Sequence, residues 1–106
     1  MTKNKFGARK MRSPDGQVFD SVKEFHRWGC LRLLERGGKI SDLKRQVSFE
    51  LIPKQEGERA CSYVADFTYY QDGKLVVEDC KGFKTDVYRL KKKLMLWVHG
   101  IRIKET

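Results

Sequence analysis

The sequence lacks the long apolar runs that are typical of membrane proteins. No stretch approaches the roughly 18 uninterrupted apolar residues that a membrane-spanning helix needs. The N-terminus carries charges where a secretory signal peptide would have an apolar segment. We therefore expect a protein that neither spans a membrane nor is secreted, and that resides in the cytoplasm.

Cysteine is scarce as well. Cys30, Cys61 and Cys80 are odd in number and widely spaced, which fits free, buried thiols in a reducing cytosol better than a disulfide framework. No pair of residues has C-x-x-C or H-x-x-x-H spacing, so a structural zinc site that combines these cysteines with His26 or His99 is disfavoured.

Acidic residues are outnumbered by basic ones. Lys and Arg total 23 and Asp and Glu total 14, so the formal net charge is +9 at pH 7. Such a surplus favours a polyanionic partner, either nucleic acid or an acidic membrane surface, and charge alone does not choose between them. With 106 residues, of which 40% are hydrophobic and 35% charged, the chain is expected to form one compact domain with a modest core.

The surplus charge is concentrated at the N-terminus. Residues 1–12 contain no acid, and we interpret them as a basic arm that contacts phosphates; the alternative is a plain solvated end. The arm's basic residues are Lys3, Lys5, Arg9, Lys10 and Arg12. Residues 13–106 are then the single domain, which begins with a turn at Ser13-Pro14-Asp15-Gly16.

The pattern from about residue 20 to 36 predicts a helix. Asp20 or Ser21 is suited to the N-cap, and Gly37-Gly38 is a natural stop. The apolar stripe that repeats at helical spacing consists of Phe25, Trp28, Leu31 and Leu34, with Arg27, Arg32 and Glu35 directed to water. Alternation over residues 47–51 then predicts a half-buried strand, and residues 53–59 a polar loop.

Two segments that are rich in aromatic and β-branched residues, 63–70 and 74–81, flank the pair Asp72-Gly73. Asp-Gly in this setting is a strong signal for a hairpin with a two-residue turn. A second helix is predicted between the cap Thr85 and the stop Gly100, and residues 101–103 suit a last strand. The stripe expected to face the core of that helix is Val87, Leu90, Leu94 and Trp97 or Val98. The element order is α-β-β-β-α-β.

The hairpin register makes a specific statement about two acids. If Asp72-Gly73 is the turn, Asp66 lies opposite Asp79, and Lys81 shares their face while Glu78 and Cys80 point to the other. Opposed side chains have Cβ atoms about 4.5–5.5 Å apart, close enough for two carboxylates to bind one cation. Like charges so placed need a counter-charge, which Lys81 and a divalent metal would supply.

The alternative is an exposed edge hairpin with solvated acids and a register slipped by a bulge. We favour the metal site because Val64, Leu75 and Val77 share the acid-bearing face, and partial burial makes unpaired carboxylates costly. Glu24 could join the site from the first helix, or it could serve a Ser21-x-x-Glu24 capping box. Gln46 is either a site-lining amide or a surface residue.

Taken together, the helix glutamate Glu24, the strand residue Asp66, and Asp79-x-Lys81 on its hairpin partner resemble the PD-(D/E)xK nuclease superfamily. The stretches Phe19-Asp20-Ser21, Tyr63-Val64-Ala65-Asp66-Phe67 and Val76 to Thr85 are similar to a small phage-encoded family known only as a domain of unknown function. Residue 65 is Ala where the motif's name has Pro, a position that supplies no ligand. Between Glu78 and Asp79, strand parity favours Asp79 as the second acid.

The resemblance implies an α/β (α+β) fold, a single αβββαβ core of restriction-endonuclease-like type with a mixed central sheet flanked by helices. It also implies an endonuclease that hydrolyses phosphodiester bonds. Asp66, Asp79 and the Cys80 backbone carbonyl would bind Mg²⁺ or Mn²⁺, and Glu24 a second ion or a water on the metal. Lys81 would orient the attacking water, whose pKa the metal lowers, and stabilise the developing charge.

The expected substrate is branched or nicked DNA, because no helix-turn-helix or zinc motif is present to read bases. Gln46, Lys84, Arg89 and Lys92 would join the arm in binding it, although the Lys91-Lys92-Lys93 run also suits a plain solvated face. A resolvase that cuts two strands would be a homodimer in the host bacterial cytoplasm. The alternative function is a non-catalytic nucleic-acid-binding module, for which the arm and Tyr69, Tyr70 and Tyr88 would suffice.

Overall fold

The computed structural model describes residues 10–80 and 83–106. In this part of the chain a two-stranded sheet pairs β1 (Met11–Arg12) with β2 (Val18–Phe19). The main sheet has four strands in the order β3-β4-β5-β6: β3 (Ser41–Ile52), β4 (Cys61–Gln71), β5 (Lys74–Asp79) and β6 (Lys104–Glu105). The helices are α1 (Val22–Arg36) and α2 (Asp86–His99).

The main sheet is mixed, as predicted. β3, β4 and β5 are antiparallel neighbours, whereas β5 and β6 are parallel and joined through α2. A parallel connection requires such a crossover segment. From α1 onward the order is α-β-β-β-α-β, which confirms the predicted sequence of elements. The last strand lies at Lys104–Glu105, just after the predicted residues 101–103.

Local signals define the element ends. The Ser21 side chain accepts a hydrogen bond from the Glu24 N–H and caps α1, which ends at Gly37. Thr85 caps α2 in the same way, and Gly100 ends it in the left-handed conformation with φ 69°. These boundaries confirm the predicted helices. Met11 and Arg12, which belong to the predicted arm, form β1.

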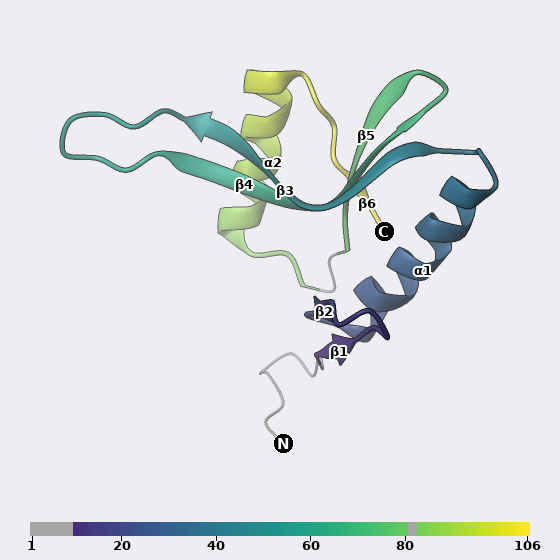
Figure 1. Cartoon of the computed structure of the whole chain (residues 1–106). Helices are drawn as coiled ribbons and strands as arrows, with labels where there is room; N and C mark the ends of the chain where they lie inside the picture. The colour runs from purple at the N-terminus through teal and green to yellow at the C-terminus, as the bar shows by residue number, and fades with distance from the viewer. Residues whose placement is uncertain (1–9, 81–82) are drawn as a thin grey trace.

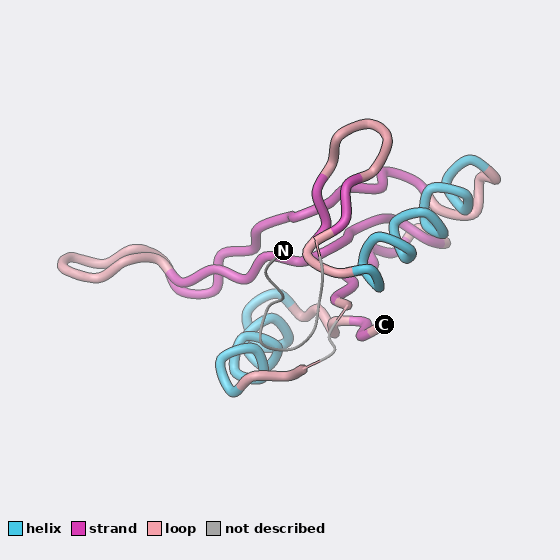
Figure 2. The backbone as a smooth tube through the Cα atoms, turned by 90° about the horizontal axis from the view of Figure 1, so that it is seen from below, coloured by secondary structure: helices cyan, strands magenta, loops and turns pink. Residues whose placement is uncertain are grey.

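Each helix covers its own stretch of the long β3–β4 ribbon. Figure 1 shows α1 beside one end of the ribbon and α2 beside the other, and Figure 2 shows the same separation from below. Under α1, Leu31 packs with Ile40, Phe67 and Tyr69. The cluster under α2 consists of Leu51, Tyr63, Ala65, Val77, Tyr88, Met95 and Ile103.

The predicted inner face of α2 is wrong. Val87, Leu90 and Trp97 are 64%, 58% and 83% exposed, while Tyr88 and Met95 are the buried residues of this helix. The buried positions, Tyr88 and Met95, each follow a predicted core position, Val87 or Leu94, by one residue. Of the expected stripe, Leu94 packs partly against the core.

Three smaller expectations are also corrected. Leu34 is 37% exposed, and Cys30 is exposed rather than buried. Val64 and Leu75 are 48% and 39% exposed, so the partial burial expected for the acid-bearing face holds for Val77 alone.

Within residues 10–80 and 83–106, no helix is long and apolar enough to cross a membrane.

Candidate active site

The β4–β5 hairpin has the register that the sequence predicted. Asp72 and Gly73 both have positive φ, 53° and 76°, as a two-residue type I′ turn requires. Gln71 pairs with Lys74, and the ladder continues without a shift to Phe67 opposite Glu78. Asp66 therefore follows directly on the end of the paired ladder, beside the last residues of β5.

Asp66 links three parts of the fold. Its Oδ2 accepts a hydrogen bond of 2.8 Å from the Cys80 N–H, and its Oδ1 lies 3.5 Å from Nε2 of Gln46. Asp66 is itself half-buried, and Gln46 is exposed with φ 54°. Gln46 thus lines the site rather than lying on a remote surface.

Asp79 is buried at the end of β5. It is 1% exposed, and the hydroxyl of Tyr63 donates a hydrogen bond to its Oδ2. Burial, followed by this hydrogen bond and the charge of Asp79, raises the pKa of Tyr63, and burial likewise raises the pKa of Tyr88. The Asp66 charge contributes to both pKa shifts, which places Asp66 and Asp79 in the same electrostatic neighbourhood.

Glu24 reaches this neighbourhood from α1. It is 4% exposed, and its Oε1 lies 3.2 Å from Nη2 of Arg45. Burial raises the pKa of Glu24, and opposing but smaller contributions come from Arg45 and from a hydrogen bond with the Asp66 side chain. Of the predicted capping box, the Ser21 side chain accepts its hydrogen bond from the Glu24 N–H. The Glu24 carboxylate instead turns inward to Arg45 and Asp66.

Arg45 is a site residue that the sequence reasoning missed. Its guanidinium donates to the Gln17 side chain, the Val18 carbonyl and Glu24, and its Cζ lies 3.8 Å from the centre of the Phe19 ring. The side chain is 14% exposed. A signal existed: Arg45 occupies an inward position of β3, in phase with Val47 and the further odd-numbered apolar residues.

Glu78 has a different partner from Asp79. Arg27 donates two hydrogen bonds to its carboxylate, at 2.8 and 2.7 Å, and the Tyr69 hydroxyl donates a third. Arg27 was expected to face water; it instead pairs with a carboxylate that is 0% exposed. Burial alone would raise the pKa of Glu78, but these bonds outweigh it and lower the pKa. Glu78 is thus committed to a structural ion pair.

Cys80 is a further predicted residue that adjoins the cluster. Burial raises the pKa of the Cys80 thiol, which lies 3.2 Å from Oγ1 of Thr106. Lys81 lies outside the described residues. Among the residues that are described, no three His, Cys, Asp or Glu side chains form a group of the kind that could hold a metal ion.

The predicted nucleic-acid contacts are dispersed. Lys3, Lys5 and Arg9 lie outside the described residues. Lys10 and Arg12 are exposed beside the β1–β2 turn. In and just before α2, Lys84 and Lys92 each lie 3.2 Å from Oε1 of Glu105, and Arg89 lies 3.4 Å from Asp86.

Comparison with known proteins identifies a family but no function. A family model described as "Protein of unknown function (DUF1064)" matches residues 3–102. Searches of the curated proteins and of the solved structures found no significant match.

Proposed function

The chain belongs to the DUF1064 family of proteins of unknown function, and we propose that it is a metal-dependent endonuclease of the PD-(D/E)xK type. Its reaction would be hydrolysis of phosphodiester bonds in branched or nicked DNA. The α-β-β-β-α-β order and the mixed sheet are the features of the fold that support the superfamily assignment.

One observation carries the proposal. Three elements that are distant in sequence bring polar groups to one place: Glu24 from α1, Asp66 from β4 and the Cys80 backbone from the end of β5. Burying carboxylates is costly for folding, and carboxylates held in this way are frequent at functional sites. The excess of basic residues over acidic ones in the chain is consistent with a polyanionic substrate.

The donor set fits Mg²⁺ or Mn²⁺. Asp66, Asp79 and Glu24 offer carboxylate oxygens, and Cys80 adds a backbone carbonyl; these hard oxygen donors are the ligands that both ions prefer. Mg²⁺ commonly binds through one or two carboxylates with waters and substrate phosphates, so a cage of three side chains is not required. When bound, the ion would polarise the scissile phosphate and lower the pKa of water.

The chain's own residues would divide the remaining tasks. Asp66 and Asp79 would hold the ion, Glu24 would hold a second ion or a water, and Lys81 would orient the attacking water and stabilise negative charge on the phosphate. Arg45 is a positioning residue, because its guanidinium holds the Glu24 carboxylate at 3.2 Å. Cutting both strands of a four-way junction would need two copies of the chain related by twofold symmetry.

The proposal is tested by incubating the purified protein with labelled linear, nicked, flap and four-way-junction DNA in Mg²⁺ or Mn²⁺. Asp66→Asn and Lys81→Ala should each lower the cleavage rate at least about a hundredfold, since even outer-shell partners of a metal cost 10–100-fold. Glu58→Gln is the matched control, because it removes one carboxylate from the exposed loop between β3 and β4.

Retained cleavage in Asp66→Asn and Lys81→Ala would remove these residues from the mechanism. A wild-type protein that binds DNA but cuts none of the substrates would instead favour the non-catalytic binding module. Circular dichroism of each variant separates loss of chemistry from loss of fold.

A further inference from the structure

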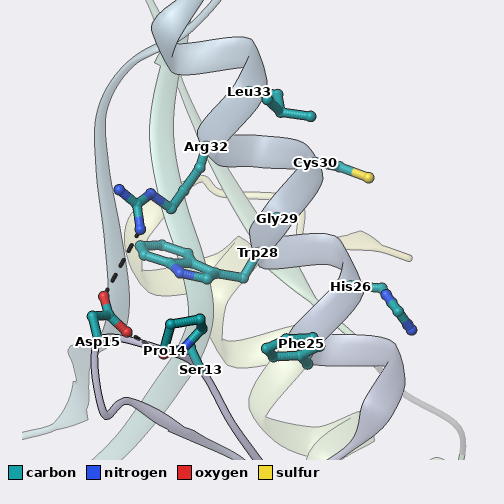
Figure 3. Close-up of a pocket in the computed structure, with 10 residues that line it drawn as sticks. All are labelled: Ser13, Pro14, Asp15, Phe25, His26, Trp28, Gly29, Cys30, Arg32 and Leu33. Atoms are coloured by element: carbon teal, nitrogen blue, oxygen red, sulfur yellow. Dashed lines mark hydrogen bonds and ion pairs between the residues drawn. The ribbon is translucent and has the colours of Figure 1, made fainter.

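A pocket of about 450 Å³ lies between the β1–β2 turn and the outer side of α1. Figure 3 shows Phe25 and Trp28 of α1 facing the turn residues Ser13, Pro14 and Asp15. Pockets that hold small organic groups have volumes in this range and combine apolar walls with a few polar groups.

The aromatic wall of the pocket is fixed from behind. The Trp28 ring stacks on Phe67 in the core, with ring centres 5.9 Å apart and an angle of 16°. The Trp28 Nε1–H is buried and has no hydrogen-bond partner among the described residues. The rigid indole, with Cζ of Arg32 5.9 Å from its centre, forms a planar wall for a flat ring, whereas its buried Nε1–H does not reach the pocket.

Gly29 keeps the pocket open at the middle of α1. Glycine inside a helix is destabilising relative to alanine. Nothing lies within 4 Å of the position that a Cβ would occupy at residue 29, so packing within the chain gives no reason for glycine there. Its absent side chain leaves space for a ligand against the helix.

Polar groups border the apolar wall. Asp15 and Arg32 form an ion pair of 3.8 Å across the mouth, which Figure 3 shows above Pro14. Hydrogen bonds from Ser13 and Gln17 lower the pKa of Asp15 to about 2, so its carboxylate stays ionised as an acceptor. Arg32 supplies donors at the same edge.

We propose that this pocket binds a single unpaired nucleobase of a DNA substrate. Unpaired bases are recognised by stacking on aromatic side chains and by polar groups at their edges, and the pocket offers both. The exposed cations Lys10 and Arg12 lie next to it in sequence, where the phosphates of the same nucleotide strand could be neutralised.

The position of the pocket ties it to the proposed active site, and this step rests on the proposed function. Trp28 follows Glu24 by one helical turn, a rise of about 6 Å. Arg45, which holds Glu24, lies 5.7 Å from the Trp28 ring. A base in the pocket would therefore belong to a nucleotide close to the phosphate at Asp66, and cleavage would favour DNA with an unpaired base beside the cut.

The test measures binding in EDTA, where no cleavage occurs. Two duplexes of equal length are compared, one fully paired and one with a single unpaired 2-aminopurine, whose fluorescence reports stacking. The wild type should prefer the unpaired-base duplex about tenfold, because stacking of one base contributes about 5- to 150-fold in affinity. It should also quench the 2-aminopurine.

Gly29→Leu fills the pocket, and Gly29→Ala is its matched control. Both replace a helix-interior glycine with a strong helix former, and a Cβ at this position has no other atom within 4 Å, so both variants should fold. Gly29→Leu should lose the preference and the quenching while its affinity for the paired duplex is unchanged; Gly29→Ala should keep most of both.

The assignment is overturned if Gly29→Leu retains the preference, or if it weakens binding to both duplexes alike. Free adenosine monophosphate is titrated in parallel, and tighter binding of this nucleotide than of the unpaired-base duplex would also overturn the DNA assignment. Base selectivity without cleavage in Mg²⁺ would refute the endonuclease and keep the pocket. Cleavage without base selectivity would refute the base-binding pocket and keep the endonuclease.

Discussion

The two adjacent acids of β5, Glu78 and Asp79, are both buried but differ in their hydrogen-bond partners. Glu78 and Asp79 are 0% and 1% exposed, yet one is bound by the guanidinium of Arg27 and the other by the hydroxyl of Tyr63. A guanidinium neutralises the charge of its partner, whereas a phenol only donates a hydrogen bond. The guanidinium of Arg27 thus compensates the charge of Glu78, while the hydroxyl of Tyr63 gives Asp79 a different kind of partner.

Replacing Arg27 should reveal the cost of an uncompensated buried charge. We expect Arg27→Met to lower the free energy of unfolding at pH 7 by about 3–5 kcal/mol, the usual effect of removing one partner of a buried pair. Urea denaturation measures it. Arg32→Met is the control, since the Arg32–Asp15 pair is nearly half exposed and solvent weakens its contribution to stability. Equal effects of the two variants would contradict the structural role of the Arg27–Glu78 pair.

The Arg27–Glu78 pair also predicts how the contribution of Glu78 to stability depends on pH, and Arg27→Met should reverse the sign of that dependence. In the folded wild type the pKa of Glu78 lies below its usual 4.5, so its contribution to stability is present above that pH and disappears as the pH falls through the folded pKa. Without Arg27, burial dominates and raises the pKa of Glu78. Its contribution is then present below pH 4.5 and is lost as the pH rises through the raised pKa.

The stability difference between wild type and Arg27→Met should therefore be smaller at about pH 4 than at pH 7. Urea midpoints at both values test this expectation. A difference that is constant or that grows on acidification would mean that Glu78 does not carry the charge in question.

At the scale of elements, the residues of α2 that are buried differ from those that its apolar pattern predicts to be buried. Met95 is 0% exposed in the cluster beneath the helix, whereas Trp97 is 83% exposed. We expect Met95→Ala to lower the free energy of unfolding by about 2–5 kcal/mol. Trp97→Ala should change it by no more than about 0.5 kcal/mol, as exposed substitutions usually do. Thermal or urea unfolding checks both, and a large effect of Trp97→Ala would restore the face predicted from the sequence.

The features that the sequence predicted well are those that local chemistry determines. Ser21 and Thr85 cap the helices because their hydroxyls accept N–H groups within one turn, and Asp72-Gly73 adopts the positive φ angles that fix the hairpin register. The proximity of Asp66 to the end of β5 followed from that register alone.

The features that the sequence did not predict depend on contacts between distant segments. Arg27 is predicted to face water because its partner, Glu78, is 51 positions away along the chain. The sequence does not distinguish Arg45 from the other arginines, because its contacts with Phe19 and Glu24 arise only when β3 packs beside α1 and β2. The side of α2 that meets the sheet is likewise set by the docking of the crossover, and an apolar stripe as broad as that of α2 allows more than one choice.

At the scale of the whole molecule, the net charge of +9 is not spread evenly among free cations. Arg27 and Arg45 are engaged with Glu78 and Glu24 in the interior, and Lys84 and Lys92 share Glu105. Lys84 and Lys92 would have to exchange a protein carboxylate for a phosphate, which reduces what each could contribute to DNA binding.

The basic N-terminal segment should therefore contribute more to DNA affinity than the lysines near Glu105. Replacing Lys3, Lys5 and Arg9 with serine removes three cations, whereas deleting residues 1–12 would also remove β1, which pairs with the buried Phe19. If all three contact duplex phosphates, the slope of log K against log salt should become shallower by about 2.7.

Lys84→Ser with Lys92→Ser is the comparison, and its change in slope should be smaller, because Glu105 already neutralises part of that charge. Fluorescence anisotropy with a paired duplex over a range of salt concentrations measures both slopes. An unchanged slope in the serine-substituted arm would show that the arm is merely solvated. A larger change in the Lys84 and Lys92 variant would move the DNA path to the side of the molecule that carries α2.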